Sequence, residues 1–211
     1  MYRPAHFAED DIGVLVDLVR TAGFGHLVAV DDIGLTSTPL PLLISDDGKV
    51  IRGHLARPNQ FWRIAPCRAV LIVPVSDTYI SPMWFPSKAE HGRVVPTWNY
   101  EVVHAHGRLV AHDEPGWIAE QIRDLTDLNE SGFAAPWSID DAPAGYIAKM
   151  AGGIVGVEMI VDRLEGKCKL SQNRSDDDLA GTIANLIDSE RRGASAIRDA
   201  MIEADGQPDA R

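Results

Sequence analysis

LTSTPLPLLISDDGKVIRGHLAR, residues 35–57, is the stretch that decides the fold class. Two extended segments, residues 35–44 and 49–55, flank Ser45-Asp46-Asp47-Gly48, which is a strong turn signal. A turn of this kind between two extended segments predicts a β-hairpin. The expected strands elsewhere also follow one another in hairpin order and not in strand–helix–strand order, which favours an antiparallel barrel over a doubly wound sheet.

Hydrophobic periodicity predicts the remaining elements and an α+β fold class. Pro39 and Pro41 cannot donate ladder hydrogen bonds, so they predict an edge or bulged strand. We expect one long helix to begin at Ser175, with Asp178 as its capping-box partner. Arg191 and Arg192 are expected to lie on this last helix, and residues 205–211 are expected to fray. We expect strands at 26–30, 68–75, 98–111 and 154–164, helices at 9–21, 58–65, 116–129 and 142–150, and mostly loop at 79–93.

The charge and the two cysteines limit the function classes. The formal charge of −11, from 31 acidic against 20 basic residues, repels phosphate backbones and anionic lipid surfaces. Any contact with DNA would therefore need a local basic patch, which the composition does not show. Cys67 and Cys168 form no CxxC pair. With no apolar run after Met1 to suggest a secretory signal and none of membrane-spanning length, the sequence predicts a soluble cytoplasmic protein that does not associate with membranes.

The first chemical cluster is Gly53-His54-Leu55-Ala56-Arg57-Pro58-Asn59-Gln60-Phe61-Trp62, where a strand ends and a helix is expected to begin. The unpaired N–H groups of a first helical turn attract anions, and an arginine fork suits phosphate. Taken alone, the cluster is also compatible with an ordinary strand-to-helix turn that carries a surface arginine.

Aromatic side chains gather in two loops, Tyr79–Lys88 and Val95–Tyr100, which are also rich in proline and polar residues. A flat heteroaromatic ligand needs apolar surfaces and a few placed hydrogen-bonding groups. These loops therefore fit a ring-binding site, although loops packed by their own side chains would look the same.

Two further segments are rich in polar groups. Residues 164–173 bring Lys167 and Lys169 together with serine, glutamine and asparagine, which makes a donor-rich segment or a solvated connector. Residues 36–38, Thr-Ser-Thr, offer hydroxyl or backbone contacts to a ring, or form a polar edge strand.

In this order, the clusters resemble the PaiB family of FMN-binding negative transcriptional regulators of the split-barrel class. The resemblance covers nearly the whole chain, but this family usually has Ala-Asn-Pro-Gln-Trp after the arginine, whereas residues 58–62 here are Pro-Asn-Gln-Phe-Trp. The matching motifs are MYRPAHF (1–7), GHLAR (53–57), YISP (79–82), WFPSK (84–88), VPTWNY (95–100), VHAHGRL (103–109), Ala142-Pro143, IVGVE (154–158), LEGK (164–167) and SQN (171–173).

The resemblance implies a split barrel over residues 1–170, a C-terminal helical extension over 171–211, and a homodimer that binds FMN at its subunit interface. It also implies repression of target genes, and so a DNA target. The cofactor-binding residues expected on this basis are Thr36, Ser37, Thr38, His54, Leu55, Ala56, Arg57, Asn59, Trp62, Tyr79, Ser81, Trp84, Lys88, Trp98, Tyr100, Lys167, Lys169, Ser171, Gln172 and Asn173.

Two alternative functions remain open at this point. One is an FMN-dependent oxidoreductase of the flavin reductase type, although no acid–base pair indicates catalytic residues. The other is a haem-binding split barrel with His104 or His106 as the axial ligand, since these two side chains share one face of a strand. No cysteine or glutamate pair completes a metal site beside them, so no metal is expected.

Overall fold

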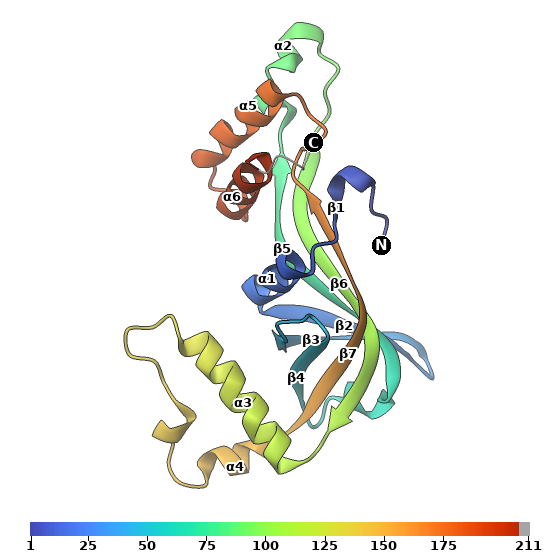
Figure 1. The fold of residues 1–211 in the computed structure, drawn as a ribbon, viewed down its shortest axis with the longest axis vertical. Coiled ribbons are helices and arrows are strands. Elements are labelled where there is room, and N and C mark those ends of the chain that lie inside the picture. Colours follow the sequence, from blue (N-terminus) through green and yellow to red (C-terminus); the bar gives the residue numbers. More distant parts are fainter. Residues whose placement is uncertain (207–211) are drawn as a thin grey trace. The chain divides into compact units, whose positions relative to one another are not determined.

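The computed structural model describes residues 1–206, which divide into two compact units (Figure 1). Within the described residues, unit 1 consists of residues 1–10, 74–103 and 165–206, and unit 2 consists of residues 11–73 and 104–164. Each unit is built from segments far apart in the sequence, because three long strands contribute residues to both. No helix within residues 1–206 is long and apolar enough to span a bilayer.

One seven-stranded sheet contains all the described strands, in the order β1-β7-β4-β3-β2-β5-β6. An additional β6–β7 pairing joins the last strand to the second and closes six strands into a barrel, as expected from the hairpin order. The strands are β1 (Ala8–Glu9), β2 (Phe24–Asp31), β3 (Gly34–Ile44), β4 (Val50–Ala56), β5 (Cys67–Ile80), β6 (Thr97–His112) and β7 (Ile154–Lys169).

The predicted hairpin is confirmed as β3 and β4, with Leu42 opposite Gly53. The prediction that β3 is an edge strand is wrong for the strand as a whole, because β3 lies between β2 and β4. Pro39 and Pro41 pair with β2, whereas the ladder to β4 covers only residues 42–44. The prolines thus lie on the half of β3 that β4 does not pair, where their missing N–H groups cost no ladder bond.

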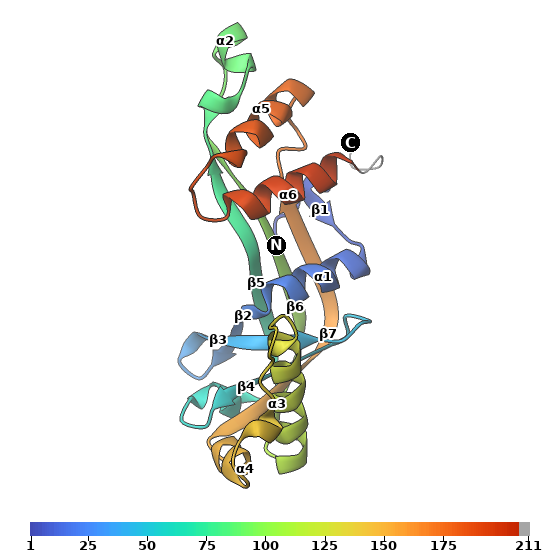
Figure 2. The same ribbon diagram turned by 90° about the vertical axis from the view of Figure 1, so that its left-hand side faces the viewer.

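Unit 2 packs helix α1 (Ile12–Ala22) and helix α3 (Pro115–Glu130) with its strands, as Figure 2 shows from the side. Asp11 caps α1 by accepting from the N–H of Val14, and Gly23 ends it in the left-handed conformation. Along β4 the side chains alternate, so that Ile51 and Leu55 enter the core while Arg52 and His54 lie on the opposite face.

Unit 1 has its own apolar core, built around helices α5 (Asp176–Ile187) and α6 (Ala194–Asp205). The predicted single long helix after Ser175 is therefore wrong, because residues 188–193 interrupt it and contain Arg191 and Arg192. Gly193 has φ +73°, and a Cβ there would lie 2.1 Å from the carbonyl oxygen of Asp77. This close approach fixes the break. Of the predicted frayed end, residues 207–211 lie outside the described residues.

Smaller departures concern helix starts and lengths. Ser175 caps α5 as predicted, but the carboxylate of Asp178 accepts from the backbone and hydroxyl of Ser87 and does not complete a capping box. The helix expected at 58–65 is a 3-10 helix, Gln60–Ile64, capped by Asn59. The stretch 79–93 holds the end of β5, a 3-10 helix (Pro82–Trp84) and helix α2 (Ser87–His91), and helix α4 is Tyr146–Ala151.

Candidate functional site

The GHLAR motif directs the side chain of His54 toward α3. Gly53 lies so close to β3 that a Cβ would be 2.8 Å from the carbonyl oxygen of Pro41. Nδ1 of His54 lies 2.9 Å from Oε1 of Gln121, and Leu55 is buried in the core. A ligand can therefore meet Leu55 only through its backbone, while His54 already has a side-chain partner.

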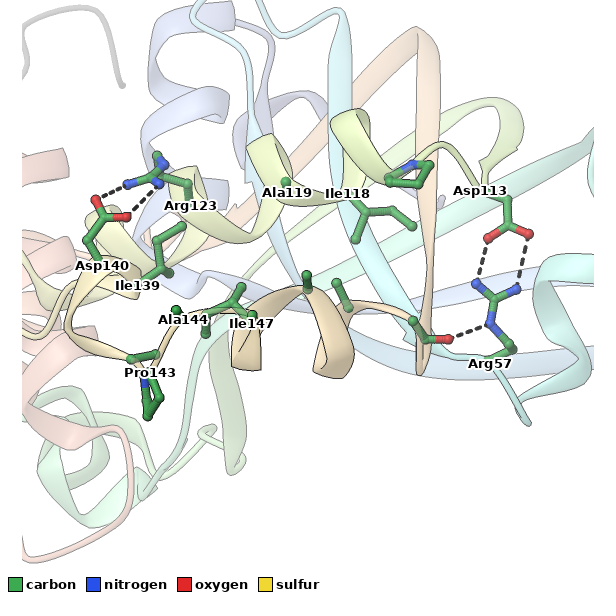
Figure 3. Close-up of a pocket in the computed structure, with 16 residues that line it drawn as sticks. Arg57, Asp113, Ile118, Ala119, Arg123, Ile139, Asp140, Pro143, Ala144 and Ile147 are labelled. Atoms are coloured by element: carbon green, nitrogen blue, oxygen red, sulfur yellow. Dashed lines mark hydrogen bonds and ion pairs between the residues drawn. The ribbon is translucent and has the colours of Figure 1, made fainter.

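Arg57 uses its guanidinium as a clamp within unit 2 (Figure 3). Its Nη1 and Nη2 donate to the two carboxylate oxygens of Asp113 at 3.0 and 2.6 Å. Nε donates to the carbonyl of Gly152 and Nη2 to that of Ile154. The hydrogen bond with Arg57 lowers the pKa of Asp113, and Asp113 in turn raises the pKa of Arg57. The arginine fork expected to bind phosphate thus holds a carboxylate here.

The turn after Arg57 is organised by Asn59 and Trp62. Nδ2 of Asn59 donates to Oγ1 of Thr38 at 2.8 Å, and its Oδ1 accepts from the N–H of Phe61. Nε1 of Trp62 donates to the carbonyl of Arg57 at 3.0 Å. Despite the displaced proline, the turn brings Asn59 to buried Thr38 on β3, whose neighbours Thr36 and Ser37 are half-buried and exposed.

Aromatic side chains of the predicted ring site meet within unit 1. Tyr79 and Trp98 lie edge to face at 6.2 Å between ring centroids, and Trp98 is 53% exposed. The guanidinium of Arg191 lies 5.0 Å from the Tyr79 centroid. Ser81 caps the following 3-10 helix, Trp84 packs against the helical core, and Lys88 is exposed on α2.

Lys167 and Lys169 lie on β7 and point to the same face of the strand. Lys167 is only 8% exposed, and its Nζ lies 5.3 Å from the ring centroids of both Tyr2 and Tyr100. Nζ of Lys169 donates to Oγ1 of Thr97 at 2.7 Å and to the carbonyl of Trp98 at 2.6 Å. Burial, then Arg174 and then Lys167, lower the pKa of Lys169. These three basic residues form a cationic cluster.

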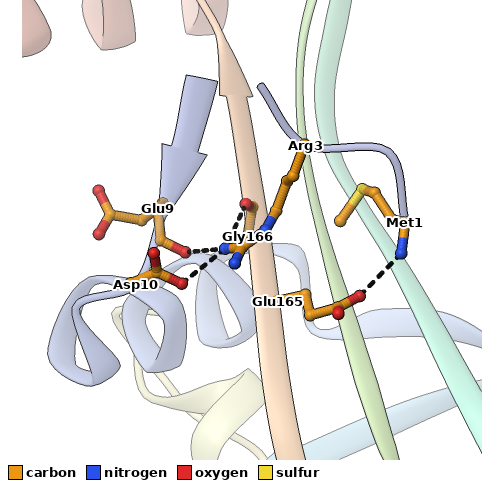
Figure 4. Close-up of polar contacts among 6 residues, drawn as sticks. All are labelled: Met1, Arg3, Glu9, Asp10, Glu165 and Gly166. Carbon is orange, nitrogen blue, oxygen red and sulfur yellow. Dashed lines mark hydrogen bonds and ion pairs between the residues drawn. The ribbon is translucent and has the colours of Figure 1, made fainter. Parts of the chain in front are cut away.

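The first residues of the chain lie against the same part of β7 (Figure 4). The amino group of Met1 is 2.9 Å from Oε2 of Glu165. Nη1 of Arg3 donates to Asp10 at 2.7 Å and to the carbonyls of Glu9 and Gly166. This segment carries Tyr2, which the sequence analysis did not include among the ligand-binding residues although the MYRPAHF motif marked it.

The SQN motif closes the cluster at the end of β7. Ser171 is buried with φ +70°, and its Oγ lies 3.0 Å from Nδ2 of Asn99, which is fully buried. Gln172 bonds back to the carbonyl of Cys168 at 2.6 Å, and Asn173 is exposed. The sequence analysis missed Asn99 and Arg174 as site residues.

The expected residues therefore form two groups, one in each unit. Thr36, Ser37, Thr38, His54, Leu55, Ala56, Arg57, Asn59 and Trp62 belong to unit 2, and the remaining eleven belong to unit 1. His104 and His106 lie two apart on β6 with ring centroids 6.2 Å apart, as their spacing predicts. The ligand-binding roles stay predictions.

A family model described as "Putative FMN-binding domain" matches residues 1–163. The chain belongs to this family. It is 30% identical over 207 residues to "Protease synthase and sporulation protein PAI 2" of Bacillus subtilis, covering 95% of this chain and 96% of the relative. It is also 28% identical to "Uncharacterized protein AN0679" of Emericella nidulans, covering 88% and 90%. The resemblance inferred from the ordered motifs is thereby confirmed.

Solved structures confirm the split-barrel fold. The flavocytochrome Anf3 from Azotobacter vinelandii matches with a TM-score of 0.59 and 14% identity, over 85% of this chain and 78% of that chain. The FAD and heme binding protein from Mycobacterium smegmatis matches with a TM-score of 0.59 and 15% identity, over 82% and 78%. At these identities the likeness concerns the fold alone.

Proposed function

We propose that this family member binds FMN as a homodimer and acts as a PaiB-type negative regulator of gene expression. One observation carries the ligand proposal: Lys167 is buried, and among residues 1–206 it has two tyrosine rings but no carboxylate as a partner. A buried ammonium without a counter-charge is costly, and cation–π contacts offset only part of that cost. An anionic ligand would supply the missing charge.

The neighbours of Lys167 fit a phosphate. Lys169 and Arg174 add positive charge, and the contacts of Lys169 to Thr97 and Trp98 are to neutral oxygens. Phosphate favours such charge-assisted hydrogen bonds. We therefore assign the FMN phosphate to the cationic cluster of Lys167, Lys169 and Arg174.

The exposed Tyr79–Trp98 pair fits a flat ring system beside that cluster. A half-exposed indole at a T-shaped contact offers an apolar face that a tricyclic ring can cover. FMN, when bound, supplies one- and two-electron redox chemistry; the chain's own residues bind and orient it, and no general acid or base is assigned.

The regulatory part of the proposal draws its support from the Bacillus relative, whose name links it to protease synthesis and sporulation. A formal charge of −11 opposes tight unaided contact with DNA, so we propose that any operator contact is made by a local surface of the dimer.

The test is the spectrum and activity of the purified protein. We expect flavin absorbance bands, release of FMN on denaturation, and a dimer by light scattering. Retention of operator DNA, with NADH oxidation no faster than that of free FMN, supports the regulator. Turnover above that background supports the oxidoreductase instead, and haem without flavin would overturn the ligand proposal.

A further inference from the structure

A separate cavity of about 750 Å³ lies within unit 2, between helix α3 and the segment that contains helix α4 (Figure 3). Of the residues expected to bind FMN, only Arg57 lines it. Its volume falls within the range of about 300–1,000 Å³ that is usual for small-molecule sites. The two proposals therefore concern largely different residues.

Most of the residues that line the cavity are apolar. Ile118 and Ile139 are buried lining residues, and Ile147 adds a third aliphatic side chain. Ala119 on α3 and Ala148 on α4 line it with side chains of a single methyl group. Small side chains of this kind let a slender or flat molecule approach the backbone closely.

The charges at the cavity cancel in pairs. Arg57 binds Asp113 with two hydrogen bonds, and Arg123 binds Asp140 with two, at 2.9 and 3.1 Å. Figure 3 shows one pair at each end of the lining. Each hydrogen-bonded arginine lowers the pKa of its aspartate, so both pairs stay charged near neutral pH.

We propose that this cavity binds an uncharged, largely apolar small molecule that carries a hydrogen-bonding group at one end. The two arginines and two aspartates that line it give it no formal charge. A charged ligand would find no uncompensated counter-charge in either Arg–Asp pair, whereas a neutral polar group needs none and can bond to either member. The proposal does not rest on flavin binding.

The test compares two probes with the same ring system, using the full chain with and without added FMN. N-phenyl-1-naphthylamine is uncharged, and 1-anilinonaphthalene-8-sulfonate is anionic. Equilibrium dialysis should show one saturable site for the neutral probe and affinity at least about tenfold lower for the anionic one. Equal affinity for the two would contradict the role of the paired charges.

Two substitutions fill the cavity from opposite walls, Ala119→Trp on α3 and Ala148→Trp on α4. Each should weaken the neutral probe by at least about tenfold, while Ala196→Trp on the exposed face of α6 leaves it unchanged. Unchanged binding in both cavity variants overturns the proposal. Absence of probe binding in the wild-type protein also overturns the proposal. If the two cavity variants are then monomers by light scattering, a second copy of the chain occupies the cavity.

Discussion

Arg57 and Lys167 are two cations among the residues that the sequence predicts to bind the cofactor, and their surroundings are opposite. Arg57 has an aspartate and two backbone carbonyls as acceptors, and its side chain is 38% exposed. Lys167 is 8% exposed, and within residues 1–206 the partners of its ammonium group are the rings of Tyr2 and Tyr100. The difference shows that an arginine or lysine in a motif indicates an anionic ligand only when the folded protein leaves its positive charge without a carboxylate partner.

The largest effect we expect tests whether the two lysines share one face of β7. Cys168 lies between them in sequence, and adjacent cations normally lower the pKa of a thiol. Instead, burial, then Glu101 and then Glu9, raise the pKa of Cys168 from 9.0 to about 12. The two lysines do not lower it because alternate residues of a strand point to opposite faces. The Cys67→Ser protein, with Cys168 as its one thiol, should react with a disulfide reagent on the order of 100-fold more slowly folded than unfolded.

Cys67 provides the matched control for that measurement. Burial also raises its pKa, but no carboxylate adds to the effect. The Cys168→Ser protein should therefore show the smaller slowing. A folded Cys168 that reacts as fast as an unfolded thiol would place it on the lysine face and break the comparison.

The second effect concerns Lys167 itself. Lys167→Met removes the charge and keeps the length of the side chain. We expect FMN affinity to fall by about 10- to 100-fold, as for loss of a charge-assisted hydrogen bond, and riboflavin affinity by less than about threefold. The free energy of unfolding of the flavin-free protein should not fall, because methionine packs well against aromatic rings and needs no counter-charge. Titration calorimetry and urea unfolding measure the two.

Lys49→Met is the control, since the Lys49 side chain is 76% exposed and outside the cluster. It should leave both affinities unchanged. Equal losses of FMN and riboflavin in Lys167→Met would show that Lys167 supports the ring and not the phosphate.

How much of this the sequence could predict depends on whether the cause is local. The β3–β4 hairpin follows from a turn of four residues, and the cap of α5 from one serine. The start of α6 at Gly193 lies against Asp77, a contact over more than a hundred residues that hydrophobic periodicity does not reveal.

The candidate site shows the same limit. The motifs identified Arg57, Lys167 and Lys169, but residue types do not reveal partners. Asp113 lies 56 positions after Arg57 and appears in no motif. Burial of Lys167 against Tyr2 depends on the first residues of the chain lying beside β7. The sequence therefore predicts which residues are candidates, and the fold decides which of them have charge to offer a ligand.

The third effect sharpens the assignment of Arg57. Arg57→Ala should lower FMN affinity by no more than about 3- to 10-fold, less than Lys167→Met, because protein oxygens already accept from most of the guanidinium N–H groups. Asp113→Asn separates the two roles of Arg57. If Arg57 releases Asp113 to bind the phosphate, Asp113→Asn should bind FMN more tightly than the wild type does. If Arg57 is a structural clamp, as we expect, the variant should bind neither FMN nor riboflavin more tightly than the wild type does. Calorimetric titration of both ligands decides.

The smallest effect is on the pH dependence of stability, where the two units should respond with opposite signs. Arg57 lowers the pKa of Asp113 in the folded protein. The ion pair therefore stabilises the fold fully above pH 3.8, the pKa of Asp113 in the unfolded chain, and this stabilisation is lost as the pH falls through the lower folded pKa. In unit 1, burial raises the pKa of Glu101 from 4.5 despite its hydrogen bond to Ser76. The protonated Glu101 side chain therefore contributes its full stabilisation to the free energy of unfolding below pH 4.5, and this stabilisation is lost as the pH rises through the higher folded pKa.

Glu101→Gln should therefore raise the free energy of unfolding at neutral pH, by at most about 1 kcal/mol, and leave it nearly unchanged in acid. Asp113→Asn should lower it at neutral pH and lose that effect in strong acid. Glu90→Gln, at an exposed position on α2, is the control and should leave the free energy of unfolding unchanged at neutral and at acid pH. Urea unfolding between about pH 2 and pH 7 measures all three. Parallel curves for Glu101→Gln and Asp113→Asn would mean that burial of charge does not distinguish the two units, and the contrast between Arg57 and Lys167 would lose its electrostatic basis.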